Sequence, residues 1–508
     1  MKICNIIEQI SKKTLIRKHV FYIYLYTSIS FLYLFLGRIN GDEGWYLYAS
    51  KMVYSGNLPY IDFSYTQSPL LPYVFGITQL LFGPDLYIGR LTSIFFGVLV
   101  CVLVYKTTLI VCKDNKSNIA LALLCFNPFY IYFSTITKTY ALTSFFIMLS
   151  TWIILSPIFR KNARIFLSIF FMCMAIAVRI SVFPALIVLI IYIIYLEKKN
   201  YAYILWLMIV CMSSLALVFF PFLLINKDAV IFNVIEYHLH RSSWDLATVI
   251  NNRLINLFYM SIVFFPVSII LFINAYLGAK NRIIDIKLIY LYSIIVSIFI
   301  TQFFFINPTY AEYFVILFPI TVILVEHGIN SLNHNRDFII RLTYIAIFCG
   351  LLFQFAIGSG LNLSYSVNLL ENRLPIEEVK DISEYIKSNI PQNSYILTFY
   401  TDIAIEAKRD VLHGFEMGIF SYYENMSSYE AKKYKIINND IMINYIVSKS
   451  AYAILLSDNH VRKYKNYIEK NYYLARTMDN WLGEGENISI YLINKSTIPI
   501  NTSDLSLH

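Results

Sequence analysis

Hydrophobic and polar positions divide the first 360 residues into long apolar runs separated by short polar breaks. A helix needs roughly 20 apolar residues to cross the hydrocarbon core of a bilayer. About eleven runs approach that length, at 19–37, 88–111, 117–133, 140–157, 164–178, 181–196, 203–225, 254–278, 287–306, 310–326 and 340–358. The first run lacks a small-residue cleavage site, so we expect it to remain as a span. The pattern predicts an α-helical polytopic membrane protein.

Basic residues predict how these spans are oriented. Lys12, Lys13, Arg17 and Lys18 precede the first run, and every second connection after it is also basic, at 113–116, 160–164, 198–199, 280–287 and 336–341. Lysine and arginine are enriched in cytoplasmic loops. We therefore expect a multi-pass protein of the cell membrane with a cytoplasmic N-terminus. Segments 38–87 and 226–253 and the C-terminal tail would then lie outside.

Segment 38–87 is too long for a simple connection and contains a helical pattern. Its apolar positions recur with the spacing of one helix face, at Trp45, Tyr48, Ala49, Met52 and Val53. Gly56 is a natural stop for this helix, which we expect to lie along the membrane surface. Asp42 and Glu43 fall at its N-terminus, where the helix dipole favours negative charge. They are therefore either helix-capping residues or members of a site.

The tail changes character at about residue 371. Helical and strand-like stretches alternate in it, which predicts a small extracytoplasmic α/β domain over 371–508, following a membrane domain over 1–360. The stretch "EAKRDVLHGFEMGIF", residues 406–420, is dense in charge. It is either a turn with internal ion pairs or a contact with the membrane domain or a substrate.

Composition strengthens the membrane assignment and narrows the partners. The chain is 58% hydrophobic and 14% charged, whereas soluble domains carry about 25% charged residues. The net charge of +9 is concentrated in the predicted inner loops, so it is a topology signal and we expect no nucleic-acid partner. None of the seven cysteines lies in the polar tail and no C-x-x-C pattern occurs, which argues against a disulfide framework or a zinc site.

Candidate chemistry gathers at the predicted outer ends of the spans. Lys138, Arg179, Tyr310 and Glu312 lie at such ends, and His238, His240 and Arg241 lie in the second outer segment. Ionisable groups at the membrane edge are costly and are functional candidates by default. Lys138 could instead snorkel to the interface, and the two histidines could bind a metal ion or, with Arg241, an anion. Carboxylates facing cations suit a general base opposite a departing phosphate.

Several stretches carry a family likeness over about residues 15–330. They are "GDEGWYLYASKMVYSG", "YTQSPLLPYVFG", "GRLTSIFFG", "FNPFYIYFSTITKTYALTSFF" and "RISVFPAL". Their order resembles the GT-C superfamily of membrane glycosyltransferases, in its protein O-mannosyltransferase-like branch. That branch includes the lipid A aminoarabinose transferases and the Rgt-type enzymes. The resemblance implies transfer of a sugar from a dolichyl- or undecaprenyl-phosphate donor to an extracytoplasmic lipid, glycan or protein acceptor.

The resemblance also implies roles for residues. Asp42 matches the acidic residue that acts at the acceptor, and Glu43 adjoins it, so both are catalytic candidates. The expected contacts are Lys138, Arg179, His238 and Arg241 for the donor phosphate, and Tyr65, Gln67, Tyr310 and Glu312 for the substrates. Two departures stand out: relatives often have Lys-Pro-Pro where this chain has Gln67-Ser68-Pro69, and Arg then Asp where it has Lys138-Thr139-Tyr140.

Two alternatives remain open at the sequence level. A transporter or lipid-linked sugar flippase would also be polytopic, but it predicts ionisable residues at mid-span and related halves, whereas the charges here gather at the outer boundary. We expect no required metal or other cofactor, although Asp42 and Glu43 could hold Mg²⁺ or Mn²⁺ through oxygen ligands.

Overall fold

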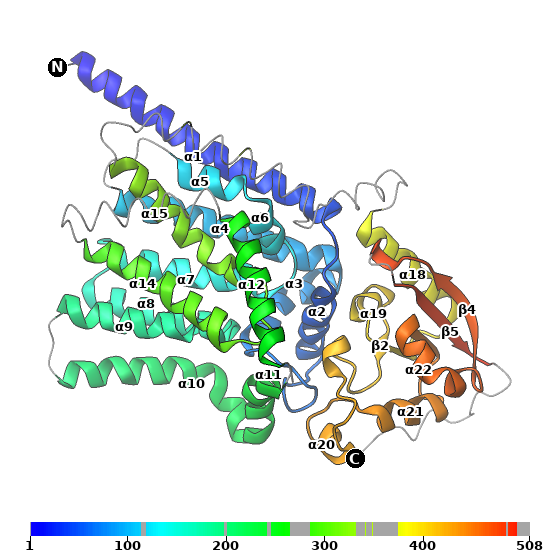
Figure 1. Ribbon diagram of the computed structural model, residues 1–508. Helices are drawn as coiled ribbons and strands as arrows, with labels where there is room; N and C mark the ends of the chain where they lie inside the picture. The colour runs from blue at the N-terminus through cyan, green and yellow to red at the C-terminus, as the bar shows by residue number, and fades with distance from the viewer. Residues whose placement is uncertain are drawn as a thin grey trace.

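The structure is a computed structural model that describes residues 2–112, 118–197, 201–240, 245–264, 285–331, 374–483 and 486–494, with the single positions 341 and 348. A bundle of apolar helices forms one part, and a mixed α/β domain lies against one end of it (Figure 1). Helix α2 lies between the two parts.

Seven helices in the described ranges are long and apolar enough to cross a membrane, or eight if the bent pair α6–α7 is one span. They are built from α1 (Lys2–Leu36), α4 (Leu86–Val111), α8 (Lys161–Val178), η1–α9 (Ile180–Val182, Phe183–Glu197), α10–η2–α11 (Tyr201–Ile231, Phe232–Glu236, Tyr237–His240), α14–η3 (Ile286–Ile300, Thr301–Phe305) and η4–α15 (Ala311–Leu317, Phe318–Ser331). The bent pair is α6 (Pro128–Thr135) and α7 (Thr139–Leu155), which meet at 102°. The remaining helices of this part are α2 (Gly41–Tyr54), α3 (Leu70–Phe82), α5 (Ile119–Cys125) and α12 (Leu246–Val263).

Most of the predicted apolar runs coincide with these helices, but one does not. The run predicted as a continuous span at 117–133 is broken into α5 and α6. Asn127 causes the break by accepting a hydrogen bond from the Tyr130 backbone N–H at 2.8 Å, which caps a new helix. Pro128 follows at the first helical position, where its missing N–H does no harm. The run at 254–278 is described only to residue 264, and that at 340–358 lies outside the described residues except at position 348.

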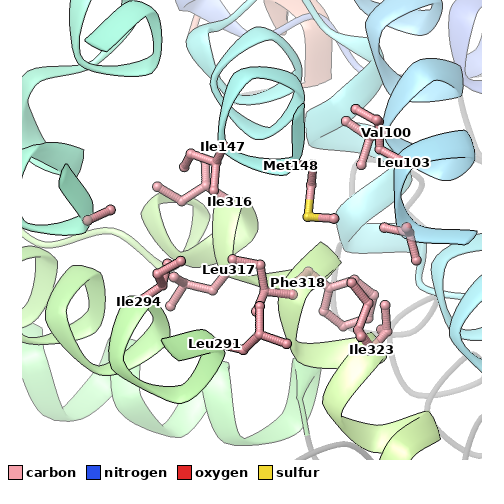
Figure 2. Packing of buried hydrophobic residues seen from close by; sticks show 14 of the residues in the cluster. Val100, Leu103, Ile147, Met148, Leu291, Ile294, Ile316, Leu317, Phe318 and Ile323 are labelled. Carbon is pink, nitrogen blue, oxygen red and sulfur yellow. The ribbon is translucent and has the colours of Figure 1, made fainter. Parts of the chain in front are cut away.

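The core of the bundle is a continuous apolar cluster. Figure 2 shows side chains of α4, α7, α14, η4 and α15 packed together, among them Val100, Met148, Leu291, Leu317 and Ile323, all almost fully buried. Because these helices are apolar on every side, packing rather than amphipathicity selects the faces that meet. This packed cluster supports the helix ends that line the cavity described below.

Helix α2 forms as predicted, but it does not lie on a surface. Asn40 and Glu43 form a reciprocal capping box at its start. At its end, Gly56 adopts φ +93°, and the N–H groups of Gly56 and Asn57 bond back to the carbonyls of Val53 and Met52. Every residue from 43 to 50 is buried, because α3 covers one side of the helix and the α/β domain the other. The expectation of a surface helix is therefore wrong.

The α/β domain contains a five-stranded sheet in the order β2-β1-β3-β5-β4. Strands β2, β1 and β3 are parallel, whereas β5 and β4 are antiparallel to their neighbours. Its elements are α18 (Pro375–Asn389), β1 (Tyr395–Thr398), α19 (Thr401–Ala407), β2 (Asp410–Val411), η5 (Gly418–Ser421), α20 (Ser428–Lys433), α21 (Asn439–Val447), β3 (Ala453–Ser457), α22 (Asp458–Ile468), β4 (Tyr472–Met478), η6 (Trp481–Gly483) and β5 (Ile488–Ile493). The alternation of helical and strand-like stretches in the sequence predicted this mixed domain.

The α/β domain is fixed to α2 by close contacts. A Cβ at Gly44 would lie 2.3 Å from the backbone nitrogen of Asp402 in α19, so only glycine allows the two helices to approach this closely. Lys51 forms an ion pair with Asp410 at 2.7 Å, and the Tyr48 hydroxyl donates to the same carboxylate at 3.2 Å. The charged stretch 406–420 thus contacts the membrane domain, and it also contains an internal pair, because His413 Nδ1 lies 3.0 Å from Glu416 Oε1.

A buried carboxyl at this seam makes stability depend on pH. Burial, with smaller contributions from the carboxylates of Glu43 and Glu406, raises the pKa of Asp402 from 3.8 to about 6. Because the folded-state pKa of this acid is raised, folding loses stability as pH rises from about 4 to about 6 and stays lower above that. We expect Asp402→Asn to raise the free energy of unfolding at pH 8 by up to about 3 kcal/mol, from the 1.36 kcal/mol that each pKa unit represents.

Thermal unfolding of the purified protein at pH 4 and pH 8 measures this effect. The gain in Tm of Asp402→Asn should appear at pH 8 and vanish at pH 4. Asp381→Asn removes an exposed carboxylate of α18 and should change Tm little at either pH. An equal gain for Asp402→Asn at both pH values would contradict the assignment.

Candidate active site

A cavity of about 310 Å³ lies at the end of the bundle that faces the α/β domain. Its polar wall contains Asp42, Gln67, Lys138, Arg179, His238 and Glu312. Its apolar wall includes Ile180, Val234, Ile235, Leu239, Phe305 and Ile306. Non-helical backbone at the level of a membrane is tolerated where it lines a cavity. Two of the polar residues lie at such breaks, Lys138 between α6 and α7 and Arg179 between α8 and η1.

Lys138 is the centre of the charged cluster. Its Nζ lies 2.6 Å from Asp42 Oδ2 and 2.8 Å from Glu312 Oε1, and its side chain is 4% exposed. It also lies 5.6 Å from the centroid of the Tyr140 ring. One buried ammonium therefore bridges the two carboxylates of the cavity wall, which come from elements 270 residues apart in the sequence. Snorkelling does not describe this side chain, since it is directed into the protein.

Asp42 lies in the first turn of α2 and faces the cavity. The Trp45 indole Nε1 donates to Asp42 Oδ1 at 3.2 Å, while Oδ2 contacts Lys138. Its side chain is 23% exposed, the most accessible member of the Lys138 cluster. Because Asn40 and Glu43 cap the helix, the carboxylate of Asp42 is not needed for that task.

Arg179 is buried on the wall next to Lys138. Its guanidinium donates to the hydroxyls of Ser181 and Thr139, each at 3.1 Å, and lies over the rings of Tyr140 and Tyr313. No carboxylate in the described part of the chain pairs with it. Its charge is therefore held by neutral partners, which leaves it available to an anion.

Glu43 is placed differently from its neighbour. Its carboxylate is fully buried outside the cavity lining and receives both Nε and Nη2 of Arg90, at 2.8 and 2.7 Å. It also accepts the backbone N–H groups of Asn40 and Thr137. With four donors filling its oxygens, Glu43 joins α2, α4 and the α6–α7 break. We therefore interpret it as a positioning residue rather than a catalytic one.

The other predicted residues divide into three groups. Gln67 and His238 line the cavity, and His238 Nε2 donates to the Thr66 carbonyl at 2.7 Å. Tyr65 is fully buried behind the wall, and Tyr310 is 37% exposed; neither lines the cavity. Arg241 lies outside the described residues.

Sequence reasoning missed several aromatic residues of the cavity. Trp45 and Tyr46 stack at 3.7 Å, and Phe420 of the α/β domain meets the Trp45 ring edge-to-face at 5.9 Å. Tyr140 and Tyr313 line the wall beside the cations. Tyr140 and Tyr313 lie close to the charged residues Lys138 and Glu312 in the sequence, and this proximity could have suggested them. Nothing local marks Phe420, which reaches the cavity because the Tyr237 hydroxyl holds its carbonyl at 3.1 Å.

The arrangement can perform proton transfer and anion stabilisation side by side. A carboxylate faces the cavity next to an aromatic wall, and two buried cations stand beside it. In the described residues, no group of three His, Cys, Asp or Glu side chains gathers in a way that could hold a metal ion. Lys138 instead supplies a positive charge between the carboxylates.

The fold of the chain is shared with two solved structures of ArnT. The structure of ArnT from Cupriavidus metallidurans bound to undecaprenyl phosphate matches with a TM-score of 0.62 and 13% identity, over 94% of this chain and 99% of that one. The apo structure of the same protein matches with a TM-score of 0.63 and 14% identity, over 93% and 97%. At this identity the likeness concerns the fold. No protein-family model and no curated protein matches the chain.

Proposed function

We propose that this protein is a membrane glycosyltransferase. It transfers a sugar from a polyprenyl-phosphate carrier to a hydroxyl of a lipid, glycan or protein acceptor on the outer face of the cell membrane. The observation that carries the proposal is the cavity itself: the accessible carboxylate of Asp42 faces two buried cations, Lys138 and Arg179, within one apolar-walled space. The ArnT fold supports it, because that fold holds undecaprenyl phosphate in one of the matched structures.

The chemistry assigns a task to each side of the cavity. Asp42 accepts the proton of the acceptor hydroxyl as the oxygen attacks the anomeric carbon of the donor sugar. The bond from that carbon to the phosphate oxygen breaks, and its electron pair stays on the phosphate. The phosphate thereby changes from a singly charged diester to a more highly charged monoester. Lys138 and Arg179 stabilise the charge that develops.

The walls of the cavity fit this division. Apolar side chains of η1, η2, α11 and η3 offer a surface for an isoprenoid chain. Trp45, Tyr46 and Phe420 form an aromatic wall on the side of Asp42, where the acceptor must approach its base. The α/β domain therefore contributes to the acceptor side through Phe420.

Binding of undecaprenyl phosphate to the purified protein tests the donor half of the proposal. We expect Arg179→Ala to raise the Kd by roughly ten- to a hundred-fold, since hydrogen bonds to charged groups contribute about 1.5–3 kcal/mol. Arg160→Ala is the matched control: Arg160 is the exposed residue at the opposite end of the same helix, α8. It should leave the Kd unchanged.

Mass spectrometry of lipid-linked sugars and envelope glycans in a deletion strain tests the transfer half. The deletion should accumulate a polyprenyl-phosphate sugar and lose one sugar from an acceptor. Failure of the protein to bind undecaprenyl phosphate would contradict the donor assignment. A purified protein that moves the donor lipid across vesicle membranes without transfer would favour a flippase instead.

A further inference from the structure

Lys138 is bound in a way that conflicts with its proposed contact to the donor. Its Nζ is 2.6 Å from the proposed base, Asp42, and 2.8 Å from Glu312, and its own side chain is 4% exposed. A carboxylate oxygen held by a buried ammonium is a poor proton acceptor, because removing a proton from a hydroxyl would require that contact to loosen. The same ammonium is one of only two described cations on the cavity wall.

The surroundings of Lys138 would let it leave at low cost. Asp42 keeps the Trp45 Nε1 hydrogen bond, and Glu312 keeps that of the Tyr140 hydroxyl at 3.2 Å. Both carboxylates are also partly exposed, at 23% and 22%, so water can replace the ammonium. Neither charge is stranded in a buried position, which is the usual penalty for breaking such a pair.

The position of Arg179 indicates the direction in which the Lys138 ammonium would move. Both cations lie near the ring of Tyr140, whose centroid is 5.6 Å from Lys138 Nζ and 5.2 Å from the Arg179 guanidinium carbon. Arg179 is fixed by Thr139, Ser181 and two aromatic rings, whereas the flexible four-carbon stem of lysine can turn. An anion bound at Arg179 would therefore attract Lys138 along the Tyr140 ring, away from Asp42.

We propose that Lys138 holds Asp42 inactive until a donor phosphate binds at Arg179 and draws the ammonium away from Asp42 toward the phosphate. This inference rests on the proposed function and adds an order to it: the donor binds first, and only then can Asp42 accept the proton of an acceptor. An acceptor that enters the empty cavity meets a carboxylate already engaged. The base and the phosphate site are thereby linked through one side chain.

Zero-length cross-linking of the full-length purified protein tests this order. A hydrophobic carbodiimide such as dicyclohexylcarbodiimide joins an amine to a touching carboxylate as an amide, and the reagent takes up the water as a urea. Mass spectrometry of the digested protein then measures the Lys138–Asp42 product. We expect this product in the ligand-free protein and a several-fold smaller yield with saturating undecaprenyl phosphate. Undecaprenol, which lacks the phosphate, should leave the yield unchanged.

An internal control lies on the same helix. Lys51 and Asp410 touch at 2.7 Å outside the cavity lining, so their product should be equal in all samples. An unchanged Lys138–Asp42 yield while undecaprenyl phosphate is bound would overturn the ordered release and leave the proposed function intact. Absence of this product from ligand-free protein, beside a normal Lys51–Asp410 product, would also overturn it. No binding of undecaprenyl phosphate at all would instead contradict the proposed function.

Discussion

Asp42→Asn is expected to lower the rate of sugar transfer by on the order of 10²–10⁴, the usual scale for loss of a general base. Asparagine keeps the size of the side chain and an oxygen that can accept the Trp45 indole N–H. It removes the basicity and the charge that pairs with Lys138. Helix α2 should remain intact, because its cap is made by Asn40 and Glu43. The substitution therefore separates proton transfer from folding.

Initial rates with donor lipid extracted from the deletion strain measure this effect. Undecaprenyl phosphate should still bind the Asp42→Asn variant, since Arg179 is untouched. Transfer at a near-normal rate by this variant would contradict the proposal that Asp42 is the general base. The search would then move to Glu312, the other carboxylate of the cavity wall.

Arg90→Met is expected to lower the free energy of unfolding by about 3–5 kcal/mol, as loss of one partner of a buried ion pair does. Arg90 is fully buried and binds both oxygens of Glu43. Its other N–H groups satisfy the carbonyls at the end of α1, those of Tyr33, Leu34, Gly37 and Arg38. Methionine has a similar length but no donor, so a buried carboxylate and the α1 carbonyls lose their partner.

Thermal unfolding in detergent, followed by size-exclusion chromatography, measures the loss. Lys51→Met removes an ion pair whose side chains are 22% and 57% exposed, and such pairs contribute less than about 1 kcal/mol. The double variant Arg90→Met, Glu43→Met should regain part of the stability, because no lone charge remains. A small loss for Arg90→Met alone, similar to that of the Lys51 variant, would show that this pair does not hold the helices together.

Local signals account for the parts of this molecule that could be predicted from its sequence. The capping box and Gly56 define α2 within its own few residues. Lys138, Arg179 and Glu312 stood out because a charge at the end of an apolar run needs a reason, and the structure gathers all three in one cavity.

Long-range pairings account for what could not be predicted. Glu43 and Arg90 lie 47 positions apart, and neither sequence context indicates the other, so Glu43 was grouped with Asp42. Tyr65 and Tyr310 were predicted in an aromatic-rich chain, whereas Tyr46 and Tyr313 are the tyrosines that line the cavity. The break at Asn127 was hidden by the apolar residues on both sides of it.

The seam between α2 and the α/β domain has a consequence for biosynthesis. A ribosome makes α2 among its first products and the wall residue Phe420 more than 360 residues later. Until then α2 lacks the partner that buries one of its sides, and Gly44 has no helix against it. The cavity lined by Phe420 therefore cannot be completed while the chain is being inserted. It is completed only when the tail has folded and docked, because an unfinished chain has Trp45 and Tyr46 but lacks Phe420, the third aromatic residue of the wall.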